Sequence, residues 1–180
     1  MADVDKAVQF VLHQEDESLS GDITTLPGDR GGPTRFGLAS ASHPDLMADG
    51  YYEVENGAPK IAHDEALAIA EKAYAEQYAA KVQLEHIDDQ DVANRVLSFA
   101  VNEGPHEAVA LLQRALNTCG SSLSVDGILG GATLAAVNAA DPAQVIASLR
   151  AQQSGFYRRL VAARPDLLPY LHGLLNRAEA

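Results

Sequence analysis

Tryptophan is absent from this 180-residue sequence, and cysteine occurs once. No apolar run is long enough to span a bilayer. The single Cys119 excludes an internal disulfide, as suits synthesis in a reducing cytosol. No cysteine or histidine cluster has zinc-ligand spacing, so the sequence predicts no metal site and no cofactor. The first residues lack the basic and apolar segments of a secretory signal, which predicts a protein made in the cytoplasm without a signal peptide.

Basic residues are also scarce. The chain has 13 Lys and Arg against 25 Asp and Glu, a formal net charge of −12. Tight binding to nucleic acid and adhesion to anionic lipid both depend on clustered basic residues. The sequence therefore predicts no nucleic-acid partner and no stable membrane insertion. Its 47% hydrophobic and 21% charged residues are typical of a folded globular chain.

Apolar spacing predicts a mostly α-helical (α+β) protein. Val4, Ala7, Val8, Val11 and Leu12 form one stripe of an amphipathic helix, which ends in the charged segment 13–17. Residues 43–62 are expected to form a connecting region. Further helices are expected over 64–80, from residue 88, over 105–120, over 132–138, over 142–163 and through 167–175.

Residues 18–37 interrupt this pattern with glycine, serine, threonine and proline, and they predict a short β-hairpin or a long ordered loop. Long loops in compact domains are usually functional. Glu15 lies just before this insertion at the end of a helix, where the macrodipole disfavours negative charge. A carboxyl group there is favoured in its neutral form, and a neutral acid can protonate a glycosidic oxygen.

Two aspartates in the insertion, Asp22 and Asp29, could each supply the second carboxylate that glycoside hydrolysis uses. Thr34 could hold a water molecule beside Asp29. Taken singly, each of these residues is more typical of a turn residue or a strand hydroxyl, and Glu15, Asp16 and Glu17 are typical of a solvated helix end. The hypothesis of a site depends on their occurring together.

Six motifs, spread in order over nearly the whole chain, carry a resemblance to a known family. They are Val11–Glu15, Pro27–Leu38, Ala100–Pro105, Leu112–Leu116, Val125–Gly130 with Thr133 and Leu134, and Gly173–Arg177. In this series the chain resembles the glycoside hydrolase family 108 muramidases with their C-terminal peptidoglycan-binding region. The resemblance implies a lysozyme-like fold that hydrolyses the β-1,4 bond between N-acetylmuramic acid and N-acetylglucosamine. It also implies that Glu15 is the catalytic glutamate.

The resemblance further implies a lysozyme-like catalytic half over residues 1–100 and a helical peptidoglycan-binding half over 101–180, packed as one compact unit. The N-terminal helix and a small β-hairpin would precede a helical bundle. The implied partner is the peptidoglycan glycan strand. A phage-derived, bacteriolytic endolysin would reach the cell wall in the periplasm after release by a holin or a secretion apparatus.

The sequence departs from the family pattern after Glu15, where Asp16–Ser18 replace a Gly-Gly-Tyr segment, and the stretch up to Gly31 is longer. Glu17 is therefore a register alternative to Glu15, and Asp22 an alternative to Asp29. The expected substrate-binding residues are Thr34, Arg35, Tyr78, Asn102 and Gln113. Each of these has an alternative interpretation. The amides of Asn102 and Gln113 could be buried to satisfy the backbone groups of a helix end. Arg35 could be an exposed strand residue, and Tyr78 could belong to the core.

Two other functions fit the same sequence. A lytic transglycosylase would use a lone glutamate as acid and then base. A non-catalytic peptidoglycan-binding module would explain the missing Gly-Gly-Tyr segment and the missing tryptophans. A toxin delivered to rival cells would share the hydrolase chemistry and differ in its route.

Overall fold

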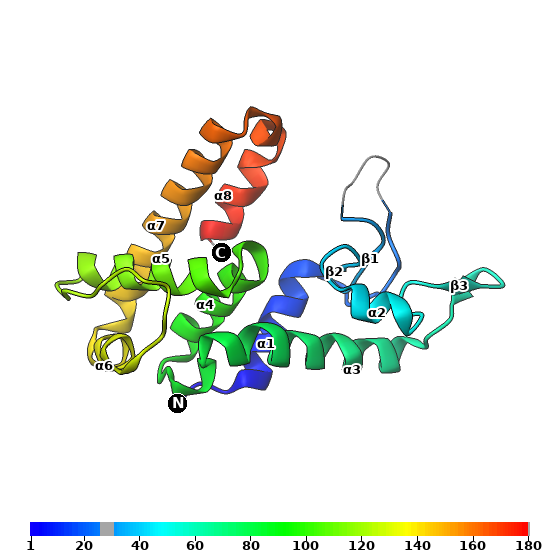
Figure 1. Ribbon diagram of the computed structural model, residues 1–180, viewed down its shortest axis with the longest axis horizontal. Helices are drawn as coiled ribbons and strands as arrows, with labels where there is room; N and C mark the ends of the chain where they lie inside the picture. The colour runs from blue at the N-terminus through cyan, green and yellow to red at the C-terminus, as the bar shows by residue number, and fades with distance from the viewer. Residues whose placement is uncertain (26–30, 180) are drawn as a thin grey trace. The chain divides into compact units, whose positions relative to one another are not determined.

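The structure is a computed structural model that describes residues 1–25 and 31–179. It divides into two compact units, Val4–Gln77 and a second unit formed by Met1–Asp3 with the chain from Tyr78 onward. Helices dominate, and the described residues form only two sheets, each of two strands (Figure 1). This confirms the mostly α-helical class. No helix in the described ranges is long and apolar enough to cross a membrane.

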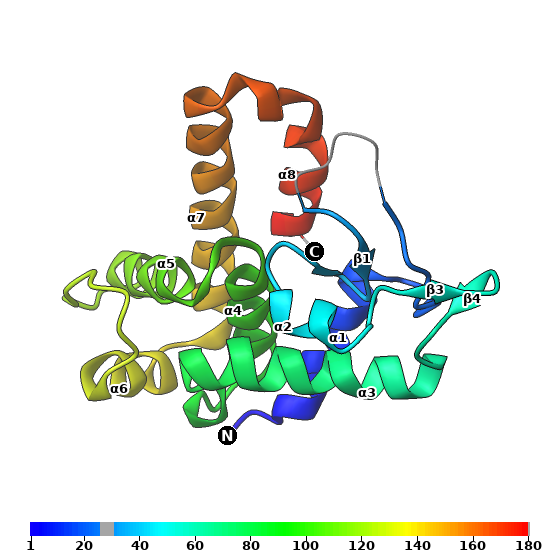
Figure 2. The ribbon, with the colours of Figure 1, turned by 45° about the vertical axis from the view of Figure 1, so that its right-hand side comes forward.

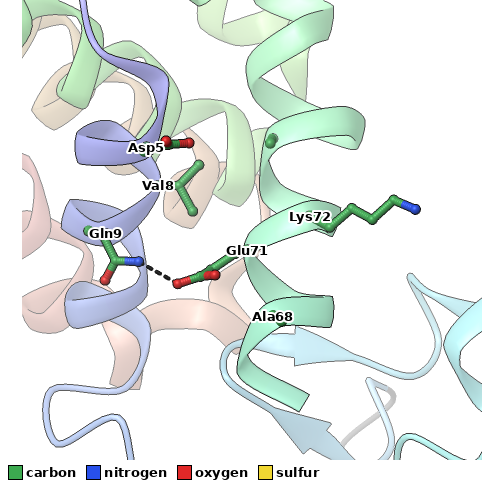
Figure 3. A pocket seen from close by; sticks show the side chains of 7 residues that line it. Asp5, Val8, Gln9, Ala68, Glu71 and Lys72 are labelled. Atoms are coloured by element: carbon green, nitrogen blue, oxygen red, sulfur yellow. Dashed lines mark hydrogen bonds between the residues drawn. The ribbon is translucent and has the colours of Figure 1, made fainter. Parts of the chain in front are cut away.

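The first unit is built on two packed helices, α1 (Val4–Glu15) and α3 (His63–Tyr74). The expected apolar stripe of α1 is buried, and α3 contributes the small residues Ala66, Ala70 and Ala73, which let the helices approach closely. Figure 3 shows the surface groove beside this contact, a hollow of about 420 Å³, where the Gln9 amide donates a 2.6 Å hydrogen bond to Glu71.

Two short hairpins and one helical turn complete this unit. Strands β1 (Thr34–Arg35) and β2 (Leu38–Ala39) pair antiparallel, with Thr34 opposite Ala39. Their turn, Phe36–Gly37, has positive φ at both residues (47° and 76°), as two-residue hairpin turns of type I′ require. Thr24 pairs with Thr34 as an isolated bridge, and the last described residues of the predicted polar insertion form the first strand and the turn of this hairpin.

Residues 43–62 are more structured than the connecting region expected from the sequence. They contain helix α2 (Pro44–Ala48) and a second hairpin, β3 (Val54–Glu55) with β4 (Ala58–Pro59). Asn56 and Gly57 form its turn with φ values of 53° and 82°. An Asn-Gly pair is a strong signal for such a turn, but the flanking strands of two residues are too short to show alternation.

The second unit is a helical bundle. After the π-helical turn Ala75–Ala79, the chain forms 3₁₀ turns at Ala80–Val82 and Leu84–His86 and then α4 (Gln90–Glu103), α5 (Pro105–Thr118), α6 (Gly131–Ala139), α7 (Pro142–Ala163), the 3₁₀ segment η4 (Pro165–Tyr170) and α8 (Leu171–Glu179). Phe99 of α4 contacts Phe156 and Tyr157 of α7 edge to face, with ring centroids 5.2 and 5.9 Å apart.

Local signals set the ends of these helices. The Asp141 carboxylate accepts a hydrogen bond from the Ala143 N–H, which fixes the start of α7. Asp89 caps α4 through the Val92 N–H at 2.9 Å, so the cap lies one residue after the predicted Asp88. The Asp88 carboxylate instead forms an ion pair with the N-terminal amine of Met1, at 3.0 Å.

Candidate active site

An open cleft of about 300 Å³ lies in the unit Val4–Gln77, where α1 ends and the β1–β2 hairpin begins. Its lining is mostly polar and combines carboxylates with hydroxyls. The lining residues are Glu15, Asp16, Ser20, Asp22, Thr24, Thr34, Phe36 and Gly37. The cleft thus contains three of the residues singled out from the sequence, Glu15, Asp22 and Thr34.

Glu15 is the last residue of α1 and is half-buried at the wall of this cleft. The Phe36–Gly37 turn packs directly against its stem. A Cβ added at Gly37 would lie 2.5 Å from the Glu15 Cβ and 2.6 Å from the Tyr74 hydroxyl oxygen. The Tyr74 hydroxyl donates a 2.9 Å hydrogen bond to the Phe36 carbonyl and so holds the turn in place. Only glycine leaves room here for the Glu15 side chain.

The neighbouring Asp16 organises the loop that follows α1. Its carboxylate accepts a 2.9 Å hydrogen bond from the Gly21 N–H and a 3.1 Å bond from the Ser18 hydroxyl. Burial raises the pKa of Asp16, but the hydrogen bonds from Gly21, Ser20 and Ser18 together lower that pKa below its ordinary value. Asp16 is therefore held as a carboxylate that shapes the loop.

Asp22 and Thr34 face the same cleft from the two sides of the insertion. The Asp22 N–H lies 3.3 Å from the Ser20 hydroxyl, and the backbones of Thr24 and Thr34 exchange two hydrogen bonds of 2.8 and 2.9 Å. Ser20 and Thr24 were missed in the sequence. Thr24 lies ten residues from its partner, and nothing in the local pattern indicates that register.

Asp29 lies outside the described residues, so its predicted role as second carboxylate stays a prediction. Glu17, the register alternative to Glu15, is exposed and is not among the residues that line the cleft.

Arg35 is neither an exposed strand residue nor a cleft residue, because its side chain is only 2% exposed. Its Nε donates a 2.8 Å hydrogen bond to the Gly21 carbonyl, and its guanidinium lies 5.4 Å from the centroid of the Tyr51 ring. Burial lowers the pKa of Arg35, and the charge of Asp22 opposes that shift. The arginine ties the cleft loop to the interior of the unit, and a side chain so buried presents no surface to a ligand.

His63, at the start of α3, supports the same loop from the other side. Its Nε2 lies 2.8 Å from the Leu19 carbonyl, and its Nδ1 lies 2.9 Å from the Asp64 carboxylate. The hydrogen bond to Leu19 and then that to Asp64 raise the pKa of His63. Its ring also contacts Phe36 edge to face at 5.5 Å. This histidine carries no signal in the sequence beyond its position before a predicted helix.

Gln113 belongs to the second unit and is 1% exposed. Its carbonyl oxygen accepts from the Asp126 and Gly127 N–H groups, both at 3.0 Å. Its amide nitrogen donates to the Asp126 carboxylate, the Ile128 carbonyl and the Thr133 hydroxyl at 2.8 to 3.2 Å. The amide fixes the Val125–Gly130 turn through these five hydrogen bonds, and its role in substrate binding stays a prediction.

Asn102 and Tyr78 also belong to the second unit. The Asn102 amide donates a 2.7 Å hydrogen bond to the Ser98 carbonyl and accepts one from Arg177 of α8, which ties the end of α4 to the last helix. Tyr78 is half-buried in the π-helical turn. A role of either residue in substrate binding stays a prediction. Within the described ranges no three histidine, cysteine or acidic side chains form a group that could hold a metal ion.

A half-buried glutamate at the end of a helix, lining an open cleft together with a second carboxylate in a mostly α-helical chain, is an arrangement suited to glycoside hydrolysis. Comparison with family models agrees. The model described as Glycosyl hydrolase 108 matches residues 8–104, and the model described as Predicted Peptidoglycan domain matches residues 107–179. The chain belongs to the glycosyl hydrolase 108 family. It is a glycoside hydrolase with a lysozyme-like fold, and its substrate is peptidoglycan.

A solved structure supports the fold. SagA from Brucella abortus is 24% identical in sequence and superposes with a TM-score of 0.65, covering 97% of this chain and 92% of SagA. At that identity the likeness shows the fold alone. A comparison with curated protein sequences finds no match. The family match extends through α4 to residue 104, whereas the compact units divide at residue 77, so the expected division at residue 100 stays a prediction.

Proposed function

We propose that this enzyme is an N-acetylmuramidase that cleaves the β-1,4 bond between N-acetylmuramic acid and N-acetylglucosamine, with Glu15 as the general acid. One observation carries the proposal: Glu15 and Asp22 line one open cleft of about 300 Å³ inside the region matched by the glycoside hydrolase family. Among the three carboxyl groups that line this cleft, Glu15 and Asp22 would supply the acid and the second carboxylate that this reaction requires.

The neighbours of Glu15 are less suited to the role of the acid. Asp16 is kept ionised by the hydrogen bonds from its own loop, and an ionised carboxylate has no proton to donate. Glu17 is exposed and lies outside the cleft lining. Glu15 is half-buried, and its stem is held by the Gly37 turn. A side chain held in this way can be presented to the leaving oxygen in a constant orientation.

Asp22 is the partner we assign among the described residues. It would activate the attacking water or stabilise the oxocarbenium-like transition state, and the Thr34 hydroxyl would help to position that water. Asp29 remains the alternative second carboxylate. Whether the anomeric configuration is inverted or retained depends on the separation of the two carboxyl groups during the reaction.

Paired substitutions test the assignment. Glu15→Gln removes the proton donor at nearly constant volume, and Glu17→Gln removes a neighbouring charge that the proposal does not use. We expect Glu15→Gln to slow clearing of purified sacculi by roughly 10²–10⁴-fold, the usual contribution of a general acid. Glu17→Gln should stay within about two-fold of the wild type. The reverse result would assign the acid to Glu17 and overturn the proposal.

The released muropeptides test the reaction itself. Hydrolysis adds one water to the product, whereas a lytic transglycosylase leaves an anhydro-sugar of lower mass. Hydrated ends on N-acetylmuramic acid support the muramidase, and anhydro ends would replace it with a transglycosylase. Release by a holin or a secretion apparatus, and an origin as a phage endolysin, are part of the same proposal. A lysis cassette beside the coding sequence would support the phage origin, and a gene for a cognate inhibitor would support the toxin route.

A further inference from the structure

The charge of this acidic chain is not evenly spread. Residues 142–178 contain five arginines and a single acidic residue, Asp166, whereas the rest of the chain contains eight basic and 24 acidic residues. The positive segment corresponds to α7, η4 and nearly all of α8. The overall charge therefore describes the rest of the molecule and not this helical hairpin.

The end of the hairpin is apolar and exposed. Helices α7 and α8 lie side by side, and η4 forms the tip that joins them (Figures 1 and 2). At this tip Leu168 is 61% exposed and Tyr170 is 65% exposed. Two exposed prolines, Pro165 and Pro169, lie before and after the Leu167–Leu168 pair. Large apolar side chains at the end of a projecting element are costly to expose to water unless a partner covers them.

Two arginines next to this tip are available for binding. Arg158 and Arg159 are exposed near the end of α7, nearly two turns before η4. In the part of the chain that the structure describes, neither guanidinium has a hydrogen-bonding or ionic partner. By contrast, Arg164 is paired with Asp166 at 2.9 Å, and Arg177 donates to Asn102.

We infer that the α7–α8 tip, defined by Arg158, Arg159, Leu168 and Tyr170, docks reversibly on an anionic phospholipid surface. The geometry favours a bilayer over a glycan strand. A tyrosine and a leucine on a protruding tip can enter the headgroup region, and arginines one or two turns behind them can remain among the phosphates. A sugar or peptide ligand is normally held in a concave site, with most of its surface covered.

The acidic remainder of the protein constrains this contact. Its charge is repelled by an anionic bilayer, and the repulsion decays over a Debye length of about 8–10 Å at physiological salt. Because the chain outside residues 142–178 contains 24 acidic and eight basic residues, binding should be weak, reversible and sensitive to salt. The inference concerns the second unit alone and does not depend on the identity of the general acid.

A single tryptophan tests the contact directly, because the wild-type chain has none. Tyr170→Trp places the reporter at the tip, and Val54→Trp places it at a matched control position that is 58% exposed on β3. With vesicles of phosphatidylethanolamine and phosphatidylglycerol, the Tyr170→Trp emission should shift to the blue and be quenched by brominated lipid. The Val54→Trp emission should not change, and neither reporter should respond to phosphatidylcholine vesicles.

Charge variants supply the second arm. Each basic residue near an anionic surface contributes about five-fold to partitioning. The double variant Arg158→Gln/Arg159→Gln should therefore bind such vesicles about 30-fold more weakly. The control Lys72→Gln/Lys81→Gln removes the same net charge at two exposed positions elsewhere and should not weaken binding. Both pairs should clear lipid-free sacculi at the wild-type rate, with unchanged circular dichroism.

Two results would overturn the inference. One is a Tyr170→Trp reporter that does not respond to anionic vesicles at low salt. The other is an Arg158→Gln/Arg159→Gln variant that binds vesicles normally but no longer sediments with sacculi, which would make the tip a peptidoglycan contact. Neither result tests the role of Glu15. The Glu15→Gln variant is assayed by cleavage of peptidoglycan, whereas the tip variants are assayed by binding to vesicles.

Discussion

Two loops of this protein, one in each compact unit, use polar side chains in opposite ways. The loop after α1 lines the cleft, where Glu15 and Asp22 border an open hollow of about 300 Å³. In the Val125–Gly130 turn, the buried Gln113 amide makes five hydrogen bonds, all to its own unit. Both segments combine glycine with aspartate, and each contains or contacts residues that the sequence predicts for the site: Glu15 and Asp22 at the first, Gln113 at the second.

The difference lies in what remains for a ligand. An amide whose donors and acceptor are all engaged within the protein stabilises a turn and has nothing to give to a substrate. Glu15 and Asp22, by contrast, line an open cleft, where a ligand can reach their side chains. A motif that resembles a family pattern is thus not evidence of a binding site until the hydrogen-bond partners of its polar atoms are known.

Among the substitutions that test this difference between the two loops, Gly37→Ala is expected to reduce activity most. In Gly37→Ala the new methyl group would meet the Glu15 stem at 2.5 Å, at a residue whose φ is already 76°. Displacing a catalytic group by about 1 Å can cost about 100-fold in rate. We therefore expect sacculus clearing to fall by about that factor, and stability to fall by about 1–3 kcal/mol.

Gly57→Ala is the matched control for Gly37→Ala. Gly57 has a similar φ of 82°, but nothing lies within 4 Å of its Cβ position. This substitution should therefore carry the backbone strain without touching the cleft, and its activity should stay near that of the wild type. Equal losses of activity in the two variants would show that strain, and not the position of Glu15, controls the rate.

The next effect concerns stability alone. Gln113→Leu leaves the partly buried N–H groups of Asp126 and Gly127 without their acceptor. The cost should be about 3 kcal/mol, a melting temperature lower by roughly 6–12 °C. The activity of the folded protein at 20 °C should change little. Gln152→Leu, which removes one long hydrogen bond of 3.5 Å, should leave the melting temperature almost unchanged. A large activity loss in Gln113→Leu below its melting range would contradict the scaffold role.

A smaller effect is expected at Asp16. Asp16→Ala removes the acceptor of the Gly21 N–H and should cost about 1 kcal/mol at pH 7. Because the pKa of Asp16 is lowered in the folded state, this stabilisation is present above its unfolded pKa of about 3.9 and is lost as the pH falls through the folded value. Melting curves of wild type and variant should therefore converge as the pH falls below the unfolded pKa of about 3.9 and through the lower folded value. The melting temperature of the control variant Glu17→Ala should equal that of the wild type at every pH.

Much of the helical fold could be predicted, because helix signals are local. The Asp141–Pro142 pair marks the start of α7, and Pro105 marks the start of α5, both as predicted. The stripe on α1 also led to Glu15 as a carboxyl group at a helix end, and the structure has the helix end there. Caps and apolar stripes involve residues within one or two turns of each other, which a sequence displays directly.

The composition of the site could be predicted only in part, because its partners are distant in sequence. Arg35 reaches the carbonyl of Gly21 across 14 residues, and Thr24 pairs with Thr34 across ten. No periodicity encodes which polar side chain turns inward to satisfy a loop carbonyl. For this reason the sequence does not reveal that Arg35 and Gln113 are buried and bonded to backbone groups.

The smallest expected effect is at His63 of α3, whose side chain supports the loop that follows α1. Protonated His63 donates to both the Leu19 carbonyl and the Asp64 carboxylate, and its pKa is raised in the folded state. Its contribution is therefore complete below the unfolded pKa of about 6.5 and is lost as the pH rises through the raised folded value. His63→Gln should lower the melting temperature slightly at pH 6 and not at pH 9.

His86→Gln is the control for His63→Gln, because both side chains are 47% exposed and each lies beside one acidic residue. Only His63 also binds a loop carbonyl, so only His63→Gln should bring a pH-dependent change. If His86→Gln follows the same pH profile, the effect comes from surface charge in general. A difference confined to His63→Gln, with activity reduced more than stability, would show that the cleft loop needs its support from α3 to keep the carboxylates in place.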